Sequence, residues 1–254
     1  MGKLNAKGTS LAYTRHGTGV PLVLIHGFPL DGSIWQEVIP FLETQFDLIV
    51  PDLRGFGSSG SVDESCTMTS MGDDLAGLLD HLGIGKVALA GHSMGGYVAL
   101  AFARKYPKRV SSLALVSSQA AGDSEERKQG RYKMAEEVAQ NGVGVVADAM
   151  AAKLSAVDRV QTFVLDLITR QSRTALICAL RAMAEREDLV QALPAFRFPI
   201  LLLHGDSDAL IPIERAREIK SIVATAQLVE MTGVGHMPMM EAAARTAEAL
   251  SLLK

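Results

Sequence analysis

A serine flanked by glycines stands where an apolar strand would give way to a helix. Residues 88–102 read ALAGHSMGGYVALAF, with Ser93 between Gly91 and Gly95. Glycines permit a sharp turn and a close approach of neighbouring backbone, and the amide-rich start of the following helix favours negative charge at the serine. We therefore expect Ser93 to act as a nucleophile rather than to fill a simple turn.

A serine hydroxyl needs a general base, and the chain has six histidines. His236 lies in a glycine-rich loop, GVGHMP at 233–238, after the last apolar strand and before a helix. Such a loop can project an imidazole over the edge of a sheet, so His236 is the predicted base. His92 adjoins the serine but is expected to point elsewhere, and His204 is expected to pack at the end of a buried strand.

The imidazole in turn needs a carboxylate to fix its tautomer. The stretch GDSDALIP at 205–212 follows another apolar strand and contains Asp206 and Asp208. The competing position, after the strand that ends at Val116, reads SSQ and contains no acid. The acid therefore comes from the loop with the two aspartates, and the pattern by itself allows either.

A sheet must hold these residues, because polar side chains at the carboxyl ends of parallel strands meet at one edge. Short apolar runs alternate with helical stretches along the chain, and runs that are apolar on both faces are typical of a covered parallel sheet. The predicted strands cover residues 10–15, 22–25, 46–50, 86–90, 110–116, 199–203 and 226–230. The first is expected to be an edge strand of a hairpin, and a helix is expected over 71–82.

One region interrupts this alternation. From about 122 to 187 the sequence has no convincing strand, only charged helical stretches, one of which should begin at Ser124. We expect a core domain made of residues 1–121 and 189–254, with a helical cap at 122–188 inserted in it.

The composition limits the partners and the compartment. The net charge of −3 gives no reason to expect nucleic acid or an anionic membrane as a partner. No apolar run approaches the roughly 18 residues of a membrane span, and the N-terminal stretch lacks the apolar segment of a secretory signal. Cys66 and Cys178 are far apart in the sequence and are expected to be free thiols in a reducing compartment. We expect a soluble cytoplasmic protein.

Five motifs together resemble one family. They are HGF at 26–28, DLRGFGSS at 52–59, GHSMGG at 91–96, HGDSDALIP at 204–212 and GHMPMME at 235–241. In this order they are similar to the motif series of the α/β-hydrolase superfamily, over the whole chain except the cap. The resemblance implies an α/β fold of the α/β-hydrolase type, with a mostly parallel central sheet, helices on both faces and a helical cap insertion.

The resemblance also implies site residues. It favours a triad of Ser93, Asp208 and His236, because relatives with this G-D-x-D pattern use the second aspartate, and it leaves Asp206 to shape the loop.

Other motif residues also receive roles. The resemblance implies an oxyanion hole formed by the backbone N–H groups of Phe28 and Met94. His26 is expected to brace the first of these loops, and Asp52 and Arg54 are expected to be structural.

The expected activity is hydrolysis of carboxylic esters of small or short-chain substrates through an acyl-enzyme intermediate, with no metal or cofactor. A serine nucleophile excludes the dehalogenase and epoxide hydrolase branches, which use aspartate. The sequence most resembles esterases and 3-oxoadipate enol-lactonase-like proteins. A lactonase of that type, C–C bond hydrolysis or perhydrolysis, and a ligand-binding signalling protein on the same fold remain alternatives.

The expected partner is a small-molecule ester or lactone. The residues that bind it and the oligomeric state are not predicted. An enol-lactone acid would need a buried arginine facing the nucleophile, and the candidates are Arg127, Arg131, Arg173 and Arg181.

Overall fold

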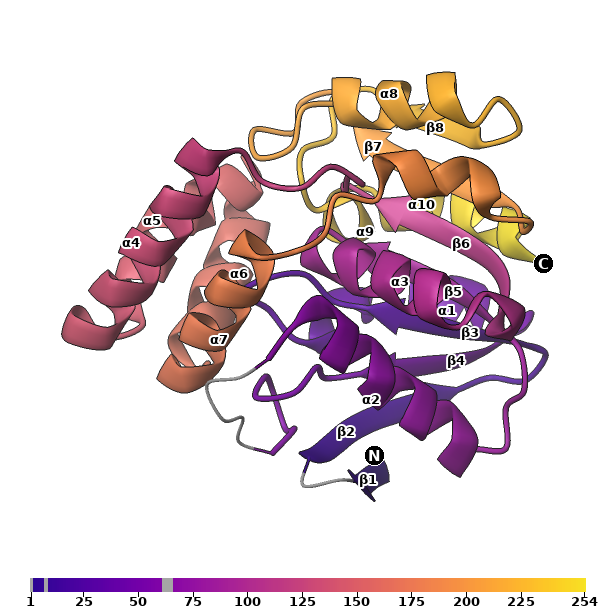
Figure 1. Cartoon of the computed structure of the whole chain (residues 1–254), viewed down its shortest axis with the longest axis horizontal. Helices are drawn as coiled ribbons and strands as arrows, with labels where there is room; N and C mark the ends of the chain where they lie inside the picture. The colour runs from indigo at the N-terminus through magenta and orange to yellow at the C-terminus, as the bar shows by residue number, and fades with distance from the viewer. Residues whose placement is uncertain (1, 7–8, 61–65) are drawn as a thin grey trace.

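The structure, a computed structural model, describes residues 2–6, 9–60 and 66–254. An eight-stranded sheet runs through it in the order β1-β2-β4-β3-β5-β6-β7-β8 (Figure 1). β1 and β2 pair antiparallel with their neighbours, and every pair from β4 to β8 is parallel. The strands are β1 Gly2–Ala6, β2 Thr9–His16, β3 Val20–Ile25, β4 Phe46–Pro51, β5 Val87–His92, β6 Val110–Val116, β7 Ile200–Gly205 and β8 Gln227–Met231.

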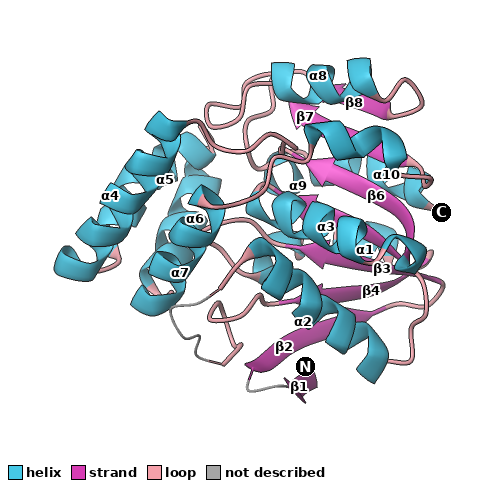
Figure 2. Ribbon diagram, in the orientation of Figure 1, coloured by secondary structure: helices cyan, strands magenta, loops and turns pink. Residues whose placement is uncertain are grey.

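Helices cover both faces of the sheet (Figure 2). α2 and α3 lie on one face, and α1 and α10 lie behind the strands on the other. The core helices are α1 Ile39–Leu42, α2 Met68–His81, α3 Met94–Lys105, α8 Glu214–Ile222, α9 Pro238–Glu241 and α10 Ala243–Leu250. Because of this covering, β4, β5 and β7 are buried along their whole length, as their continuous apolar sequences predict.

The start of the sheet differs from the prediction. The expected strand at 10–15 is present as β2, but it is not an edge strand, because β1 pairs on its outer side. The glycine turn that follows leads to β3, which is not the neighbour of β2 in the sheet; β4 lies between them. The hairpin partner of β2 is instead β1, a short polar segment with too little apolar pattern to be recognised in the sequence.

The region between β6 and β7 is helical, as predicted. It contains α4 Glu125–Asn141, α5 Gly144–Leu154, α6 Asp158–Thr169 and α7 Arg173–Ala184. Ser124 begins the first of these by accepting a hydrogen bond from the Arg127 amide at 3.3 Å. These helices lie beyond the carboxyl ends of the parallel strands (Figure 1). The predicted cap therefore occupies the side of the sheet where its loops converge.

The two connections of this insertion lie side by side. The Leu189 amide donates to the Ala120 carbonyl at 2.9 Å, and the Gly122 amide donates to the Asp188 carboxylate at 3.1 Å. Between them the fully buried carboxylate of Asp123 pairs with Arg131 and, at 2.8 Å, with Arg186. The Arg186 guanidinium also stacks on the Tyr97 ring of α3, 4.2 Å from its centroid. An ionic cluster thus joins the two ends of the insertion to each other, and the Arg186 guanidinium packs against α3 of the core.

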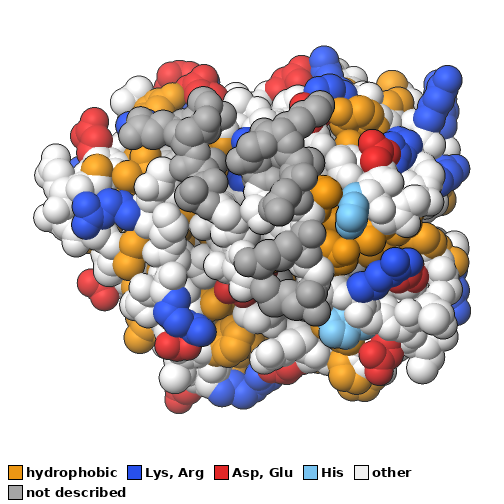
Figure 3. Space-filling model, turned by 90° about the horizontal axis from the view of Figure 1, so that it is seen from below, with side chains coloured by type: hydrophobic (Ala, Val, Ile, Leu, Met, Phe, Trp, Pro, Cys, Tyr) orange, Lys and Arg blue, Asp and Glu red, His pale blue; other side chains and the backbone are white. Residues whose placement is uncertain are grey.

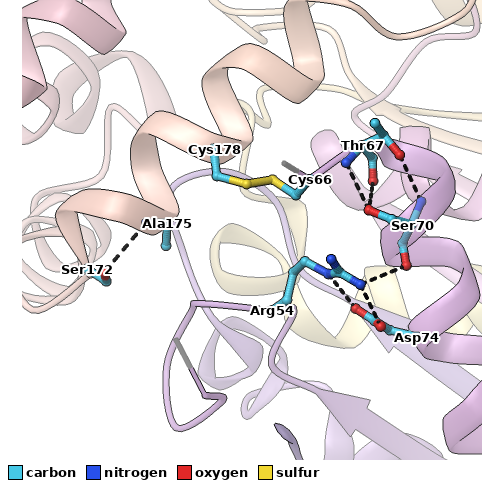
Figure 4. Close-up of a disulfide and its surroundings, with 8 residues drawn as sticks. All are labelled: Arg54, Cys66, Thr67, Ser70, Asp74, Ser172, Ala175 and Cys178. Atoms are coloured by element: carbon cyan, nitrogen blue, oxygen red, sulfur yellow. Dashed lines mark hydrogen bonds and ion pairs between the residues drawn. A yellow bond between two sulfur atoms is a disulfide. The ribbon is translucent and has the colours of Figure 1, made fainter. Parts of the chain in front are cut away.

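The prediction of free thiols is wrong. Cys66, which precedes α2, forms a disulfide with Cys178 of α7 (Figure 4). The two residues are separated by 112 positions in the sequence, but the fold brings their Cα atoms to 5.8 Å, within the range that a disulfide spans. Sequence distance therefore did not indicate spatial distance, and the inference of a reducing compartment, which depended on free thiols, no longer stands.

Basic and acidic side chains are interspersed on the face shown in Figure 3. Among the described residues, no helix is both long and apolar enough to cross a membrane.

Candidate active site

Ser93 occupies a sharp turn between β5 and α3. Its φ of 51° and ψ of −115° place a non-glycine residue in a left-handed, strained conformation. The Ser93 amide donates to the Val116 carbonyl at 2.9 Å, which fixes the turn against the neighbouring strand. Ser93 is partly exposed, whereas His92 and Met94 on either side are buried. The turn therefore presents the hydroxyl at the carboxyl edge of the sheet, as its motif predicts.

The glycines around Ser93 are required by close packing. A Cβ at Gly91 would clash with the backbone of Gly95, and a Cβ at Gly95 would clash with the Ile25 carbonyl at the end of β3. A Cβ at Gly96 would clash with the Ser118 side chain. Only hydrogen atoms fit at these positions, so the helix that leaves the serine can begin directly against two strand ends.

Asp208 and His236 come together from the loops after β7 and β8. The Asp208 Oδ2 accepts a hydrogen bond from the His236 Nδ1 at 2.7 Å. The other carboxylate oxygen accepts from the amides of Leu210 and Ile211 at 2.9 and 3.0 Å, which sets the direction of the side chain. Because Nδ1 carries the proton in this arrangement, Nε2 of the neutral imidazole is free to accept one.

The surroundings keep Asp208 ionised. Its side chain is fully buried, and burial alone would raise the pKa of its carboxyl. The charge of His236 and hydrogen bonds from His204, His236 and the Ile211 amide outweigh burial and lower the pKa of Asp208 far below its usual range. The result is a buried anion directed at one nitrogen of the imidazole.

Asp206 does not contact His236 but forms hydrogen bonds that shape the loop. It is exposed, and its Oδ1 accepts from the Gly233 amide at 2.8 Å and from the Ser207 hydroxyl at 3.0 Å. These bonds join the loop after β7 to the loop after β8. Asp206 therefore supports the loop that carries His236 without contacting the imidazole.

The loop after β3 lies against the serine turn. A Cβ at Gly27 would come within 3.0 Å of the Ser93 Cβ, so only a glycine allows this approach. His26 braces the loop, because its Nε2 accepts from the Leu53 amide at 2.9 Å while its Nδ1 donates to the Gly27 carbonyl at 3.0 Å. Neither the Phe28 nor the Met94 N–H donates a hydrogen bond within the part of the chain that the structure describes. Both predicted oxyanion donors are thus free of internal partners.

The hydrogen bond expected between Ser93 and His236 in the predicted triad is not formed. Among the described residues, neither the Ser93 Oγ nor the His236 Nε2 has a hydrogen-bond partner, so the two are not bonded to each other. Such bonds are often long in ligand-free sites and tighten when substrate binds. The structure therefore brings Asp208 and His236 into direct contact, with Ser93 on the adjoining turn.

Comparison with known proteins shows the family to which the chain belongs. The sequence model of the family described as alpha/beta hydrolase fold matches residues 20–243. The chain belongs to the α/β-hydrolase family. The predicted superfamily and fold class are confirmed, and so is the prediction of an enzyme of the carboxylic ester hydrolase kind.

Several α/β hydrolases are similar over most of this chain. A thermophilic esterase from Thermogutta terrifontis superposes with a TM-score of 0.93 at 39% identity, over 98% of this chain and 95% of the esterase. Lipase 1 of Psychrobacter immobilis is 31% identical over 96% of this chain and 80% of the lipase. An enol-lactonase from Burkholderia xenovorans superposes with a TM-score of 0.92 over 99% of both chains, but its identity of 24% shows a shared fold only.

One similar protein is much longer than this chain. The dihydrolipoyllysine-residue acetyltransferase component of the acetoin cleaving system of Pseudomonas putida is 33% identical over 89% of this chain. The chain spans 60% of that protein's length.

Two residues that contact the His236 loop were missed in the sequence. His92, expected to point elsewhere, instead packs its ring against that of His236, with centroids 4.8 Å apart. Glu241 accepts from the amides of Gly235 and Met237, at 2.6 and 3.3 Å, on both sides of the imidazole. Both residues lie inside motifs that resemble those of α/β hydrolases. Their place in the same motifs as Ser93 and His236 is the sequence signal that could have indicated a role near the site.

The buried arginine at the base of the insertion is not one of the predicted candidates. It is Arg186, and Arg127 and Arg131 lie with it around Asp123. Asp52 is structural as expected, since its two oxygens accept from the amides of Gly32 and Ser58.

Proposed function

We propose that this protein is a serine hydrolase that cleaves carboxylic esters of small or short-chain substrates through an acyl-enzyme intermediate. Ser93 is the nucleophile, His236 the general base and Asp208 the acid that orients it. The observation that carries the proposal is the 2.7 Å hydrogen bond from His236 Nδ1 to the buried Asp208, beside the strained turn of Ser93. This bond leaves Nε2 as the proton acceptor on the side of the imidazole opposite Asp208.

Acylation begins when His236 Nε2 removes the Ser93 hydroxyl proton as Oγ attacks the ester carbonyl. Negative charge then develops on the carbonyl oxygen. The free amides of Phe28 and Met94 and the N-terminus of α3 stabilise this charge, and each amide contributes on the order of 3 kcal/mol to the transition state. The imidazolium, held by Asp208, then protonates the leaving alkoxide.

Deacylation repeats the sequence with water. His236 removes a proton from a water molecule, which attacks the acyl carbonyl, and Ser93 leaves with the proton returned by the imidazolium. The steps use groups of the protein together with one water molecule, so the proposed reaction needs no metal or cofactor.

The substrate class is proposed from the surroundings of the site. Residues 1–121 and 189–254 form the core that holds the catalytic groups, and the cap at 122–188 supplies one wall of the substrate pocket. The similarity to an esterase at 39% identity supports an ester substrate. An enol-lactone acid would require an arginine that faces the nucleophile. Of the candidates, Arg131 pairs with the buried Asp123 and the exposed Arg127 lies 3.7 Å from it. The similarity to an esterase therefore carries the preference for an ester.

The test is a panel of p-nitrophenyl esters of increasing chain length together with simple lactones. We expect multiple turnovers of the short esters, and we expect Ser93→Ala to lower kcat by roughly 10⁶-fold, as loss of a serine nucleophile does in other hydrolases. Ser221→Ala, on the exposed face of α8, is the matched control and should leave kcat unchanged. Activity confined to lactones would refute the ester class. Full ester turnover by Ser93→Ala would refute the nucleophile.

A further inference from the structure

His92 links the turn of the nucleophile to the loop of the base. It is the last residue of β5, directly before Ser93, and its side chain is completely buried. Its Nε2 lies 2.9 Å from the main-chain oxygen of His236. Its ring also packs against the His236 ring, tilted by 57°. The His92 side chain therefore contacts both the backbone and the side chain of His236.

The contact fixes the tautomer of His92. A carbonyl oxygen only accepts hydrogen bonds, so Nε2 must carry the proton and donate it to His236. Nδ1 then carries no proton, and it has no hydrogen-bond partner in the described part of the chain. A Cβ at Gly27 would come within 2.6 Å of this nitrogen, so the loop after β3 closes over it. A second proton on His92 would have no acceptor.

The charges around His92 also favour the neutral form. Burial lowers the pKa of His92 well below its usual value, and the positive charge of His236 lowers it further. The other titratable groups that face it are Asp208, which opposes this effect, and His26, which adds to it. His92 therefore remains a neutral donor while His236 gains and loses its proton.

The remaining contacts of the His236 loop show what His92 adds. Asp208 holds the imidazole at Nδ1, and Glu241 holds the amides of the two flanking residues. None of these groups belongs to the strand that carries Ser93. His92 supplies the direct connection, because it is covalently joined to the nucleophile and hydrogen-bonded to the base.

We propose that His92 is a positioning residue of the active site: it donates Nε2–H to the main-chain oxygen of His236 and so sets the distance between the base and Ser93. This inference rests on the function proposed above. It assigns His92 no contact with the substrate. Its loss should therefore lower kcat and leave KM nearly unchanged.

The first test compares two variants with p-nitrophenyl acetate. His92→Phe keeps an aromatic ring but removes the donor, and we expect it to lower kcat by about 10- to 100-fold through misplacement of the base, with KM changed less than about threefold. His92→Gln restores an N–H near the position of Nε2 and should recover most of kcat. His81→Gln, on the exposed end of α2, is the matched control.

The outcomes separate this inference from the proposed function. If wild-type protein is active and Ser93→Ala is inactive, but His92→Phe equals wild type or His92→Gln is no better than His92→Phe, then the positioning role is refuted. If wild-type protein has no ester turnover or Ser93→Ala retains it, the proposed function fails instead.

A second measurement does not depend on whether the variants fold. In ¹⁵N-labelled wild-type protein, the ring nitrogens of His92 should show the Nε2–H tautomer and should not titrate between about pH 5 and 8. A ring that titrates in this range, or that carries its proton on Nδ1, would overturn the inference.

Discussion

The active-site loops and the cap are held by contacts in different places. Around the site, main-chain hydrogen bonds such as that from the Ser93 amide to the Val116 carbonyl act together with the side chains of Asp206, Glu241 and His92. The cap is joined to the core by the disulfide, by the pair of Arg159 with Glu37 at 2.7 Å and by the stacking of Arg186 on Tyr97. The two sets share none of these residues. We therefore expect single substitutions to separate chemistry from cap attachment.

Apart from loss of the nucleophile itself, the largest expected effect is on chemistry, at Asp208. In Asp208→Asn the amide keeps an oxygen for the Leu210 and Ile211 amides and turns its NH₂ toward His236. The imidazole must then accept at Nδ1 and carry its proton on Nε2, where it can no longer act as the base. We expect kcat to fall about 10⁴-fold, as in other serine hydrolases with this change, with an unaltered circular dichroism spectrum.

Asp206→Asn is the control in the same loop. The side-chain amide oxygen of this variant can still accept from the Gly233 amide, so kcat should change by no more than a few fold. A greater loss of kcat in Asp206→Asn than in Asp208→Asn would reverse the assignment of the acid.

The next effect is on cap attachment, at Asp123. Asp123→Asn leaves the buried guanidinium of Arg186 and the neighbouring Arg131 without a counter-charge. We expect the free energy of unfolding in urea to fall by about 3 kcal/mol, while the variant, when folded, turns over short esters within a few fold of wild type.

The matched control is an exposed ion pair in the cap. Asp166 of α6 and Arg170, which directly follows the last residue of that helix, lie 2.7 Å apart, with 68% and 63% of their side chains exposed. Asp166→Asn should change the free energy of unfolding by less than about 0.5 kcal/mol. Equal effects of the two substitutions would show that the buried cluster has no special role.

A smaller effect is expected from the disulfide. The Cys66→Ser/Cys178→Ser variant should lose about 2 kcal/mol of stability, measured as a fall of several degrees in Tm, because the unfolded chain is no longer cross-linked between core and cap. Short-ester kcat should be maintained below Tm. Titration of two free thiols in the native oxidised wild-type protein would contradict the bridge and restore the sequence-based prediction.

The smallest expected difference is in acid sensitivity. Burial raises the pKa of Asp123, but hydrogen bonds from Arg186 and Arg131 outweigh it, and the net pKa is lowered. A carboxyl with a lowered pKa stabilises the fold above its unfolded pKa of about 4, and this stabilisation is lost as pH falls. Between pH 5 and 3 we expect Asp123 to account for about 1 kcal/mol of lost stability. Asp123→Asn should therefore lose less stability than wild type over this interval, followed by urea unfolding; an identical loss would contradict the lowered pKa.

The sequence predicted the core and the residues at its strand ends because these depend on local patterns. Continuous apolar strands such as β5 and β7 have few alternative structures, and the turn at Ser93 requires glycines that are visible in the motif. Only the family resemblance favours Asp208 over Asp206 in the sequence, since both occupy the same loop. The tertiary structure distinguishes the two aspartates, because His236 contacts Asp208 and not Asp206.

The features missed in the sequence depend on distant pairs. Nothing local to Cys66 indicates that α7 returns to it, and the pairing of Asp123 with Arg186 joins two ends of the insertion separated by four helices. The position of β1 outside β2 similarly depends on a pairing that its polar sequence does not specify. The contact of His92 with His236 is also not visible in the local sequence, because the two residues are 144 positions apart.

The adjacent ends of the cap have a consequence for evolution. β6 and β7 are direct neighbours in the sheet, and the chain leaves one and enters the other beside the hydrogen bond between Ala120 and Leu189. An insertion whose ends meet can be lengthened, shortened or exchanged without moving any strand. Under the function proposed above, in which this segment forms one wall of the substrate pocket, relatives can acquire new substrate preferences by replacing it while the sheet and its loops stay the same.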